Sequence, residues 1–157
     1  MNRQQFEAIV NEIVKEGERV KSKYLEEPTG PVDYVGIFSR DENEKNAMLS
    51  LMKTEGEFLQ DTPTGPHYKL KRPLLTKSGL VAVIKVRTTD PKKPHRGSPD
   101  FLVDDYDSFK KKYKDRKYFN VIEREVFEMI EIWDPDADVL VYFKNIPMAQ
   151  ILGIKTD

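Results

Sequence analysis

Hydrophobic and polar positions form their clearest pattern in residues 78 to 109. Residues 80 to 87, LVAVIKVR, start apolar on both alternating faces and end with two cations, Lys85 and Arg87, on one face. Successive side chains of a strand point to opposite faces of a sheet, so the pattern predicts a central strand. The prolines and the glycine between Thr88 and Pro99 argue against regular structure there, because proline fixes φ and lacks a ladder donor. We therefore expect this strand and its loop to organise both the core and the site.

Apolar residues at helical spacing predict four helices. In residues 3–25 they recur three and four positions apart between Glu, Lys and Arg, which describes an amphipathic helix loosened at Gly17. Asp41 followed by Glu44 forms a capping-box pattern at the start of a second helix. Aspartates cap a third helix, and Pro147 starts a short last one. The predicted helices span residues 3–25, 41–55, 104–115 and 147–152.

Short runs of β-branched and aromatic residues predict the strands. Residues 32–39, VDYVGIFS, contain Gly36, which indicates a bulge or a close backbone approach. Residues 69–75 lead through a tight turn into 80–87, so these two segments should pair antiparallel. Residues 119–133 fit either a helix or a strand. The turn sequence DPDAD and the apolar run VLVYF that follow them favour a hairpin.

The predicted strands are mostly joined by hairpins, without a regular alternation of strand and helix. This order predicts an α+β fold, with a largely antiparallel sheet of six or seven strands and helices packed mainly on one face. In one version of this fold the sheet is curved and holds a ligand in its concavity. The tetrapeptide PTGP occurs at 28–31 and again at 63–66, each time before a predicted strand. The repeat leaves open whether part of the chain is duplicated.

Length and composition indicate a single globular domain over residues 1–157. The chain has no cysteine, which excludes disulfides and cysteine-based zinc or iron–sulfur sites. No apolar run approaches the roughly 18 residues that a membrane span requires, and the N-terminal segment lacks the apolar core of a signal peptide. We therefore expect a cytoplasmic protein that does not associate with membranes.

Charge is distributed unevenly along the chain, although the net charge is only −1. Residues 69–96 and 110–117 are strongly basic, whereas residues 120–138 are acidic. The fold can either pair these segments or present two oppositely charged surfaces. The second arrangement would suit an interaction module for nucleic acid or protein, since aromatic residues among the cations of 109–119 could stack on bases.

The sequence lacks the common motifs for cofactors and metals. It contains no P-loop, no dinucleotide-binding glycine pattern, no nucleophile elbow and no HExxH. DPDAD at 134–138 begins like a calcium loop but lacks the glycine at its sixth position and the glutamate at its twelfth. We therefore expect no cofactor and no metal site. The sequence does not specify an oligomeric state.

The candidate site surrounds the loop at 87–100. Arg87 and Arg96 offer planar guanidinium groups that bind oxyanions through two hydrogen bonds. Together with His95 they would line a pocket for a small anionic ligand, with aromatic residues as its walls. The predicted ligand-binding residues are Arg87, His95, Arg96, Tyr34, Phe101 and Trp133.

Two alternatives to ligand binding stay open at this stage. One is the nucleic-acid or protein interaction module that uses residues 69–96 and 110–117. The other is a small enzyme in which His95 acts as general acid or base and Asp100 or Glu128 orients it. His67, the second histidine of the chain, is interpreted as a partly exposed loop residue.

Overall fold

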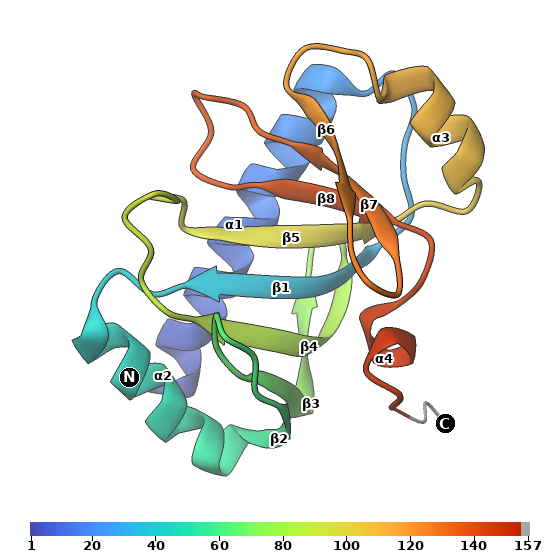
Figure 1. Cartoon of the computed structure of the whole chain (residues 1–157). Coiled ribbons are helices and arrows are strands. Elements are labelled where there is room, and N and C mark those ends of the chain that lie inside the picture. Colours follow the sequence, from blue (N-terminus) through green and yellow to red (C-terminus); the bar gives the residue numbers. More distant parts are fainter. Residues whose placement is uncertain (155–157) are drawn as a thin grey trace.

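The computed structural model of the protein describes residues 1–154 (Figure 1). All its strands belong to one eight-stranded sheet, in the order β2-β3-β4-β1-β5-β8-β7-β6. The fold is therefore α+β, as predicted. In chain order the elements are α1 (Arg3–Tyr24), β1 (Val32–Phe38), α2 (Glu42–Glu55), β2 (Gly56–Gln60), β3 (His67–Thr76), β4 (Gly79–Arg87), β5 (Gly97–Leu102), α3 (Tyr106–Tyr113), β6 (Phe119–Glu123), β7 (Glu128–Ile132), β8 (Val141–Lys144) and α4 (Met148–Ile151).

The sheet is mixed, which corrects the prediction of a largely antiparallel sheet of six or seven strands. β1 runs parallel to β4 and β5 runs parallel to β8, whereas the other neighbouring strands are antiparallel. Parallel neighbours need a long crossover connection, and the hairpin signals of the sequence give no information about such pairs. The number of strands is higher than predicted because residues 119–133 hold two of them, β6 and β7.

The sheet consists of two units with the same order of elements. The first unit is β1, α2, β2, β3 and β4, and the second is β5, α3, β6, β7 and β8. In each unit the first strand lies parallel to the last, and the two first strands meet antiparallel at the centre of the sheet. The PTGP segments do not mark this repeat. One of them precedes β1 and the other precedes β3, and these strands are not equivalent.

The three longer helices pack on one face of the sheet, and α4 lies on the other. Figure 1 shows α1 behind the sheet. Val10 of α1, Met48 of α2 and Phe109 of α3 share one core cluster with Ile84 and other residues of the central strands. Met148 of α4 belongs to a separate cluster with Tyr34 and Val83. The face opposite α1, α2 and α3 is called the open face below.

α1 runs from Arg3 to Tyr24 without a break, whereas the sequence predicts a loosening at Gly17. A capping box starts the helix, because the side chain of Asn2 accepts from the backbone N–H of Gln5 and the Gln5 side chain accepts from the backbone N–H of Asn2. At Gly17 the helix approaches β5 closely, since a Cβ atom there would lie 2.6 Å from Cγ of Pro99. Gly17 is therefore a packing residue.

Two predicted strand pairings are confirmed. β3 pairs antiparallel with β4, and β7 pairs antiparallel with β8 after the turn at 134–138. The irregular loop after β4 is shorter than predicted, because β5 already begins at Gly97 and includes Pro99. Pairing with β1 on one side and β8 on the other overrides the local proline and glycine signal.

Candidate functional site

The open face carries rows of polar side chains that the strand register brings together. Residues directly opposite each other on neighbouring strands share a face of the sheet. One such row runs through His67, Lys85, Gly36 and Ser98 on β3, β4, β1 and β5. A second row runs through Tyr34, Asp100, Tyr142, Glu131 and Asn120 on β1, β5, β8, β7 and β6. Tyr34 and Gly36 are two positions apart on β1, so both rows lie on the same face.

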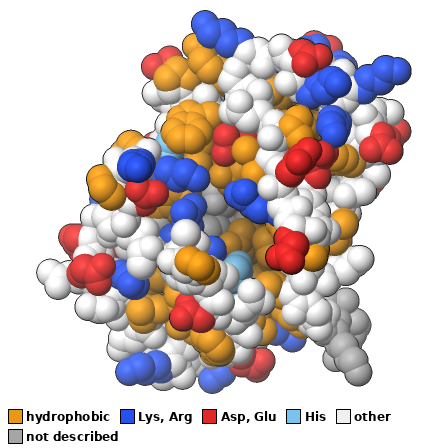
Figure 2. All heavy atoms as spheres, in the orientation of Figure 1, with side chains coloured by type: hydrophobic (Ala, Val, Ile, Leu, Met, Phe, Trp, Pro, Cys, Tyr) orange, Lys and Arg blue, Asp and Glu red, His pale blue; other side chains and the backbone are white. Residues whose placement is uncertain are grey.

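Figure 2 views the open face and shows a hollow near its centre, with Lys and Arg side chains and a histidine at its border. Several charged or polar side chains of this face are almost fully buried: His67 is 6 % exposed, Asp100 2 %, Glu131 4 % and Lys144 1 %. Burial of a charged group costs free energy unless the group is paired, so apolar packing does not explain why these side chains are buried. We define the open-face site by six residues: Tyr34, His67, Lys85, Arg87, Asp100 and Lys144.

Arg87 and Lys85 are the two cations of this site without a carboxylate partner among residues 1–154. The guanidinium carbon of Arg87 lies 4.3 Å from the ring centroid of Phe38, and its buried Nε atom has no hydrogen-bond partner. Lys85 Nζ donates to Thr64 Oγ1 at 2.6 Å. Burial, together with the positive charges of Arg87 and Arg124, lowers the pKa of Lys85 to about 8.

His67 lies beside these cations and is a buried residue of β3, which corrects its interpretation as a partly exposed loop histidine. Its Nε2 atom lies 3.2 Å from the hydroxyl of Tyr34, and its Nδ1 atom has no partner. Burial, followed by the charge of Lys85, lowers the pKa of His67 to about 4. The imidazole is therefore neutral near pH 7. Burial also raises the pKa of Tyr34, so its hydroxyl stays protonated.

Lys144 is the most buried cation of the site and forms ion pairs with two aspartates. Its Nζ atom lies 2.6 Å from Asp100 Oδ2 and 3.2 Å from Asp33 Oδ2. Burial raises the pKa of Asp100, while Lys144 opposes this effect. Asp33 also accepts from the backbone N–H of Met148 at 2.7 Å, which attaches the start of α4 to β1. The charge of Lys144 is thus paired with carboxylates within the protein, whereas the charges of Lys85 and Arg87 have no carboxylate partner among residues 1–154.

The low pKa of His67 leads to a prediction about stability and pH. Because the pKa falls from 6.5 to about 4 on folding, the neutral form stabilises the folded state above pH 6.5, and this contribution is lost as the pH falls through 4. We expect His67→Gln to flatten the loss of stability between pH 6.5 and pH 4, as measured by urea unfolding at several pH values. Equal pH dependence of the variant and the wild type would contradict the assignment.

The structure brings three of the residues singled out in the sequence to the open face. Arg87, Tyr34 and Asp100 lie on β4, β1 and β5, and the register places Tyr34 directly opposite Asp100. Arg87 stands opposite Phe38, two strand positions beyond Lys85. These residues come from distant parts of the chain, and the parallel pairing of β1 with β4 unites them.

Arg96 lies outside this group and is bound within the protein. Its guanidinium donates to Glu44 Oε1 at 2.6 Å, to Glu44 Oε2 at 3.2 Å and to the carbonyl oxygen of Phe38 at 3.0 Å. The side chain of Arg96 is only 5 % exposed. Arg96 therefore joins the end of β1 to the start of α2. Both terminal nitrogens of its guanidinium, Nη1 and Nη2, already donate hydrogen bonds.

His95 and Trp133 contact each other, with ring centroids 5.2 Å apart and the rings nearly perpendicular. Burial lowers the pKa of His95, and the carboxylates of Asp138 and Glu131 act against it. His95 also borders a cavity of about 330 Å³ beneath the loop after β4.

Phe101 and Glu128 do not lie at the open-face site. Phe101 is fully buried on the opposite face, where its ring stacks on Phe143 with centroids 6.1 Å apart. Glu128 accepts from the hydroxyl of Tyr106 at 2.7 Å and from Lys110 Nζ at 2.9 Å. The structure thus places Phe101 on the helix-covered face and pairs Glu128 with residues of α3.

Lys85, Lys144 and His67 are the site residues that the sequence did not single out as ligand contacts. The alternation of β4 places Lys85 on the same face as Arg87, and this signal was available. Lys144 ends an apolar run, and only its register against β5 shows that it reaches Asp100. His67 enters the site because β3 continues back to it through the residues next to Lys85.

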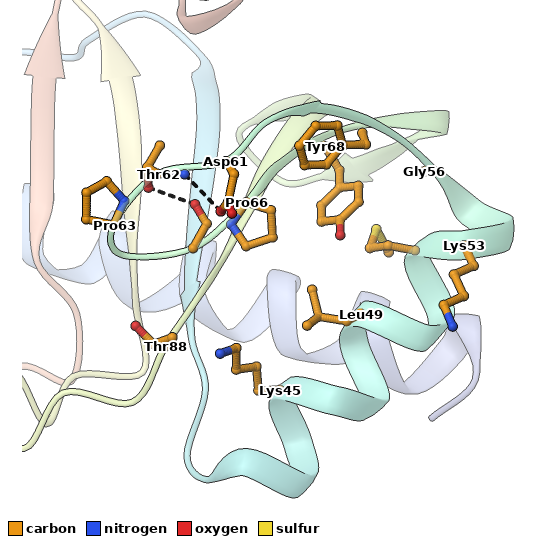
Figure 3. A pocket seen from close by; sticks show the side chains of 13 residues that line it. Lys45, Leu49, Lys53, Gly56, Asp61, Thr62, Pro63, Pro66, Tyr68 and Thr88 are labelled. Carbon is orange, nitrogen blue, oxygen red and sulfur yellow. Dashed lines mark hydrogen bonds between the residues drawn. The ribbon is translucent and has the colours of Figure 1, made fainter.

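A second cavity of about 690 Å³ lies between α2 and the loop at 61–66, outside the open-face site. Figure 3 shows Lys45 of α2 and Tyr68 of β3 pointing into it, with Leu49 between them. Its lining is mainly apolar and includes Met52, Pro63 and Pro66. The 61–66 loop separates this cavity from Lys85, because Thr64 of the same loop accepts from Lys85.

Five of the fifteen cations in the basic stretches predicted as an interaction surface form ion pairs within residues 1–154. Arg72 binds Glu55, and Arg96 binds Glu44. Lys112 contacts Glu26 and Glu27, and Arg116 binds Glu26. Lys110 reaches the acidic segment through Glu128. The cations of residues 69–96 and 110–117 are thus distributed over different elements and partners.

Within residues 1–154, no helix is long and apolar enough to cross a membrane. The same residues contain no group of three or more His, Cys, Asp and Glu side chains that could hold a metal ion.

Comparisons with known proteins give a likeness of fold. No family model matches the chain, and no curated protein sequence matches it. A solved structure described as "Structural Genomics, Protein EC4020" has a TM-score of 0.66 at 9 % sequence identity, over 93 % of this chain and 90 % of that one. A glyoxalase/bleomycin resistance protein/dioxygenase superfamily member from Vibrio splendidus 12B01 has a TM-score of 0.46 at 11 % identity, over 70 % of this chain and 94 % of that one. The first likeness establishes that another protein shares this α+β architecture over nearly its whole length.

Proposed function

We propose that the protein binds a small anionic ligand at the open-face site, with Arg87 and Lys85 as its main contacts. The main support for this proposal is the position of Arg87. Its guanidinium is held over Phe38 and has no carboxylate partner, although it is partly withdrawn from water. A guanidinium in this state can form two parallel hydrogen bonds to a carboxylate or a phosphate.

Lys85 adds a second positive charge on the same face. The two residues are two positions apart on β4, so their Cα atoms are roughly 7 Å apart. Repulsion between them contributes to the low pKa of Lys85. An anion between the two side chains would replace this repulsion by attraction, and the partly buried surroundings would strengthen the effect.

The remaining groups of the site restrict where the anion can lie. Asp100 and Glu131 are buried carboxylates of the same face, and they would repel an anion placed deep in the second row. Lys144 cannot offset this, because it is already bound to Asp33 and Asp100. We therefore place the negative group of the ligand at Arg87 and Lys85, with its uncharged part toward Tyr34 and His67.

Thermal unfolding in the presence of inorganic phosphate tests the proposal. A ligand that binds only the folded state stabilises it by about 2.7 kcal/mol at a concentration 100 times its dissociation constant. We expect phosphate to raise the melting temperature of the wild type above the value in sodium chloride of equal ionic strength. Arg87→Ala should abolish this rise.

Arg19→Ala is the matched control, because Arg19 is an exposed arginine of α1 that pairs with Glu16 on the other face of the sheet. This variant should respond to phosphate like the wild type. An unchanged phosphate response in Arg87→Ala, or an equal loss in Arg19→Ala, would show that the anion binds elsewhere or without a defined site.

A further inference from the structure

Lys85 differs from the two other substantially buried lysines of the described chain in having no carboxylate partner. Lys144 binds Asp33 and Asp100. Lys21 binds Glu18 and lies over the ring of Phe101, on the opposite face of the sheet. Ion pairs keep a lysine protonated. The absence of one therefore leaves the Lys85 amine the most available for reaction.

Lys85 lies on the open face, and the 61–66 loop holds its amine. The side chain is partly exposed, and its Nζ atom donates to Thr64 Oγ1 at 2.6 Å. Gly65 holds Thr64 near β4: its φ is +132°, and a Cβ atom there would lie 2.1 Å from the carbonyl oxygen of Val86. Only glycine allows this approach of the loop to the strand.

We propose that Lys85 is a nucleophile that forms an imine with the carbonyl carbon of a small anionic oxo acid. This inference rests on the proposed function, because Arg87 is assigned to hold the carboxylate of the oxo acid while Lys85 reaches its carbonyl group. Lysines that are desolvated and lie next to another cation are activated for such reactions. Lys85 meets both conditions, with Arg87 two positions along the same strand.

The reaction balances without a further reactant. The lone pair of the neutral amine attacks the carbonyl carbon, and the carbonyl oxygen takes a proton to give a carbinolamine. The nitrogen then loses a proton, and the hydroxyl group takes up a proton and leaves as water. The nitrogen lone pair forms the C=N bond, and loss of the remaining N–H proton gives the imine. The protons exchange with solvent. The imidazole of His67, directly opposite Lys85 on β3, is neutral near pH 7 and therefore adds no positive charge beside the reacting nitrogen.

The charged groups around Lys85 favour the free amine near neutral pH. Arg87 on the same strand and Arg124 in the turn after β6 both lower its pKa, whereas Asp61 at the start of the 61–66 loop raises it. Burial is the largest influence, and the pKa is about 8. Roughly a tenth of such amines are neutral at pH 7, against less than a thousandth for an ordinary lysine with a pKa of about 10.4.

Reductive labelling of the folded chain tests the inference. The protein is incubated at pH 7 with glyoxylate and sodium cyanoborohydride, and the labelled positions are quantified by mass spectrometry of peptides. We expect Lys85 to be labelled at least about 10-fold faster than Lys71, an exposed lysine of β3, because its neutral fraction is larger. Lys85→Arg, which keeps the charge but has no primary amine, should lose the fast label.

A parallel reaction with propanal, an uncharged aldehyde, separates the two proposals. Arg87→Ala removes a charge that lowers the pKa of Lys85, so both aldehydes should label Lys85 more slowly. The slowing should be larger for glyoxylate than for propanal, because only glyoxylate also loses the contact of its carboxylate with Arg87. If Lys85 reacts no faster than Lys71 with either aldehyde, the inference is wrong, and a normal phosphate response would still support the proposed function. If Lys85 reacts fast with both aldehydes and Arg87→Ala changes the two rates by the same factor, the anion-binding role of Arg87 is wrong.

Discussion

Replacing Lys144 with alanine should destabilise the protein by about 3–5 kcal/mol. Lys144 is 1 % exposed and bridges Asp100 of β5 and Asp33 of β1. Its removal leaves two carboxylates without their cation in a buried place, and breaking a buried ion pair on one side has a cost of this size. Urea unfolding of Lys144→Ala at pH 7 measures the effect.

Lys112→Ala serves as the control for this experiment, because Lys112 also contacts two carboxylates but does so on the surface, with Glu26 and Glu27. Water replaces such contacts, so the stability of this variant should stay close to that of the wild type. A free energy of unfolding for Lys144→Ala within about 1 kcal/mol of the wild type would contradict the account of the buried network.

Arg96→Ala should lower stability by about 2–3 kcal/mol without removing the phosphate response. The variant leaves Glu44 and the carbonyl oxygen of Phe38 without the donors that Arg96 provides, and a charged hydrogen-bonded pair of this kind contributes an amount of this order. Because Arg96 is occupied within the protein, it is not available to an anion at Arg87. Urea unfolding and phosphate-dependent melting of one preparation measure both effects.

Arg72→Ala is a suitable comparison, since the side chain of Arg72 is 69 % exposed although it pairs with Glu55. Its loss should cost less than about 1 kcal/mol. If Arg96→Ala keeps wild-type stability and loses the phosphate response, Arg96 would be a ligand contact and the assignment of the site would have to move toward the loop at 88–96.

Local patterns in the sequence were sufficient for the elements but not for their arrangement. The capping residue Asp41, the alternation in 80–87 and the turn at 134–138 act over a few residues, so helices and hairpins follow from them. The parallel pairs β1–β4 and β5–β8 depend on contacts between segments some 45 residues apart. Such pairings leave no local signal, and the repeat of two equivalent units was therefore not visible in the sequence.

Only part of the candidate site could be predicted from the sequence, because the rest depends on the pairing of distant strands. The place of Arg87 could be predicted from the strand pattern. A cation that ends an alternating apolar strand should lie on the polar face of the sheet, whereas the adjacent apolar residues face the core. Closeness in sequence suggests that Arg96 lies beside Arg87 in the site. The turn into β5 instead brings Arg96 to Glu44 on α2. Lys144 and His67 reach the site through sheet register alone.

The meeting of β1 and β5 explains why the open face is polar. Each of these strands brings buried polar residues to the centre, Tyr34 from β1 and Ser98 and Asp100 from β5. The neighbouring strands β4 and β8 add Lys85, Arg87 and Lys144 on the same face. The three longer helices pack on the other side of the sheet, and of the helices only α4 lies on this face within residues 1–154.

Titration of phosphate into the protein with ¹⁵N-labelled arginine side chains tests the central claim most directly. The Nε–Hε signal of Arg87, assigned from its absence in Arg87→Ala, reports on the guanidinium itself. The account predicts a saturable shift of this signal, while the Nε–Hε signals of Arg19 and Arg96 stay unchanged. A shift that grows linearly without saturation, or one that is larger for Arg19 or Arg96 than for Arg87, would contradict anion binding at the open-face site.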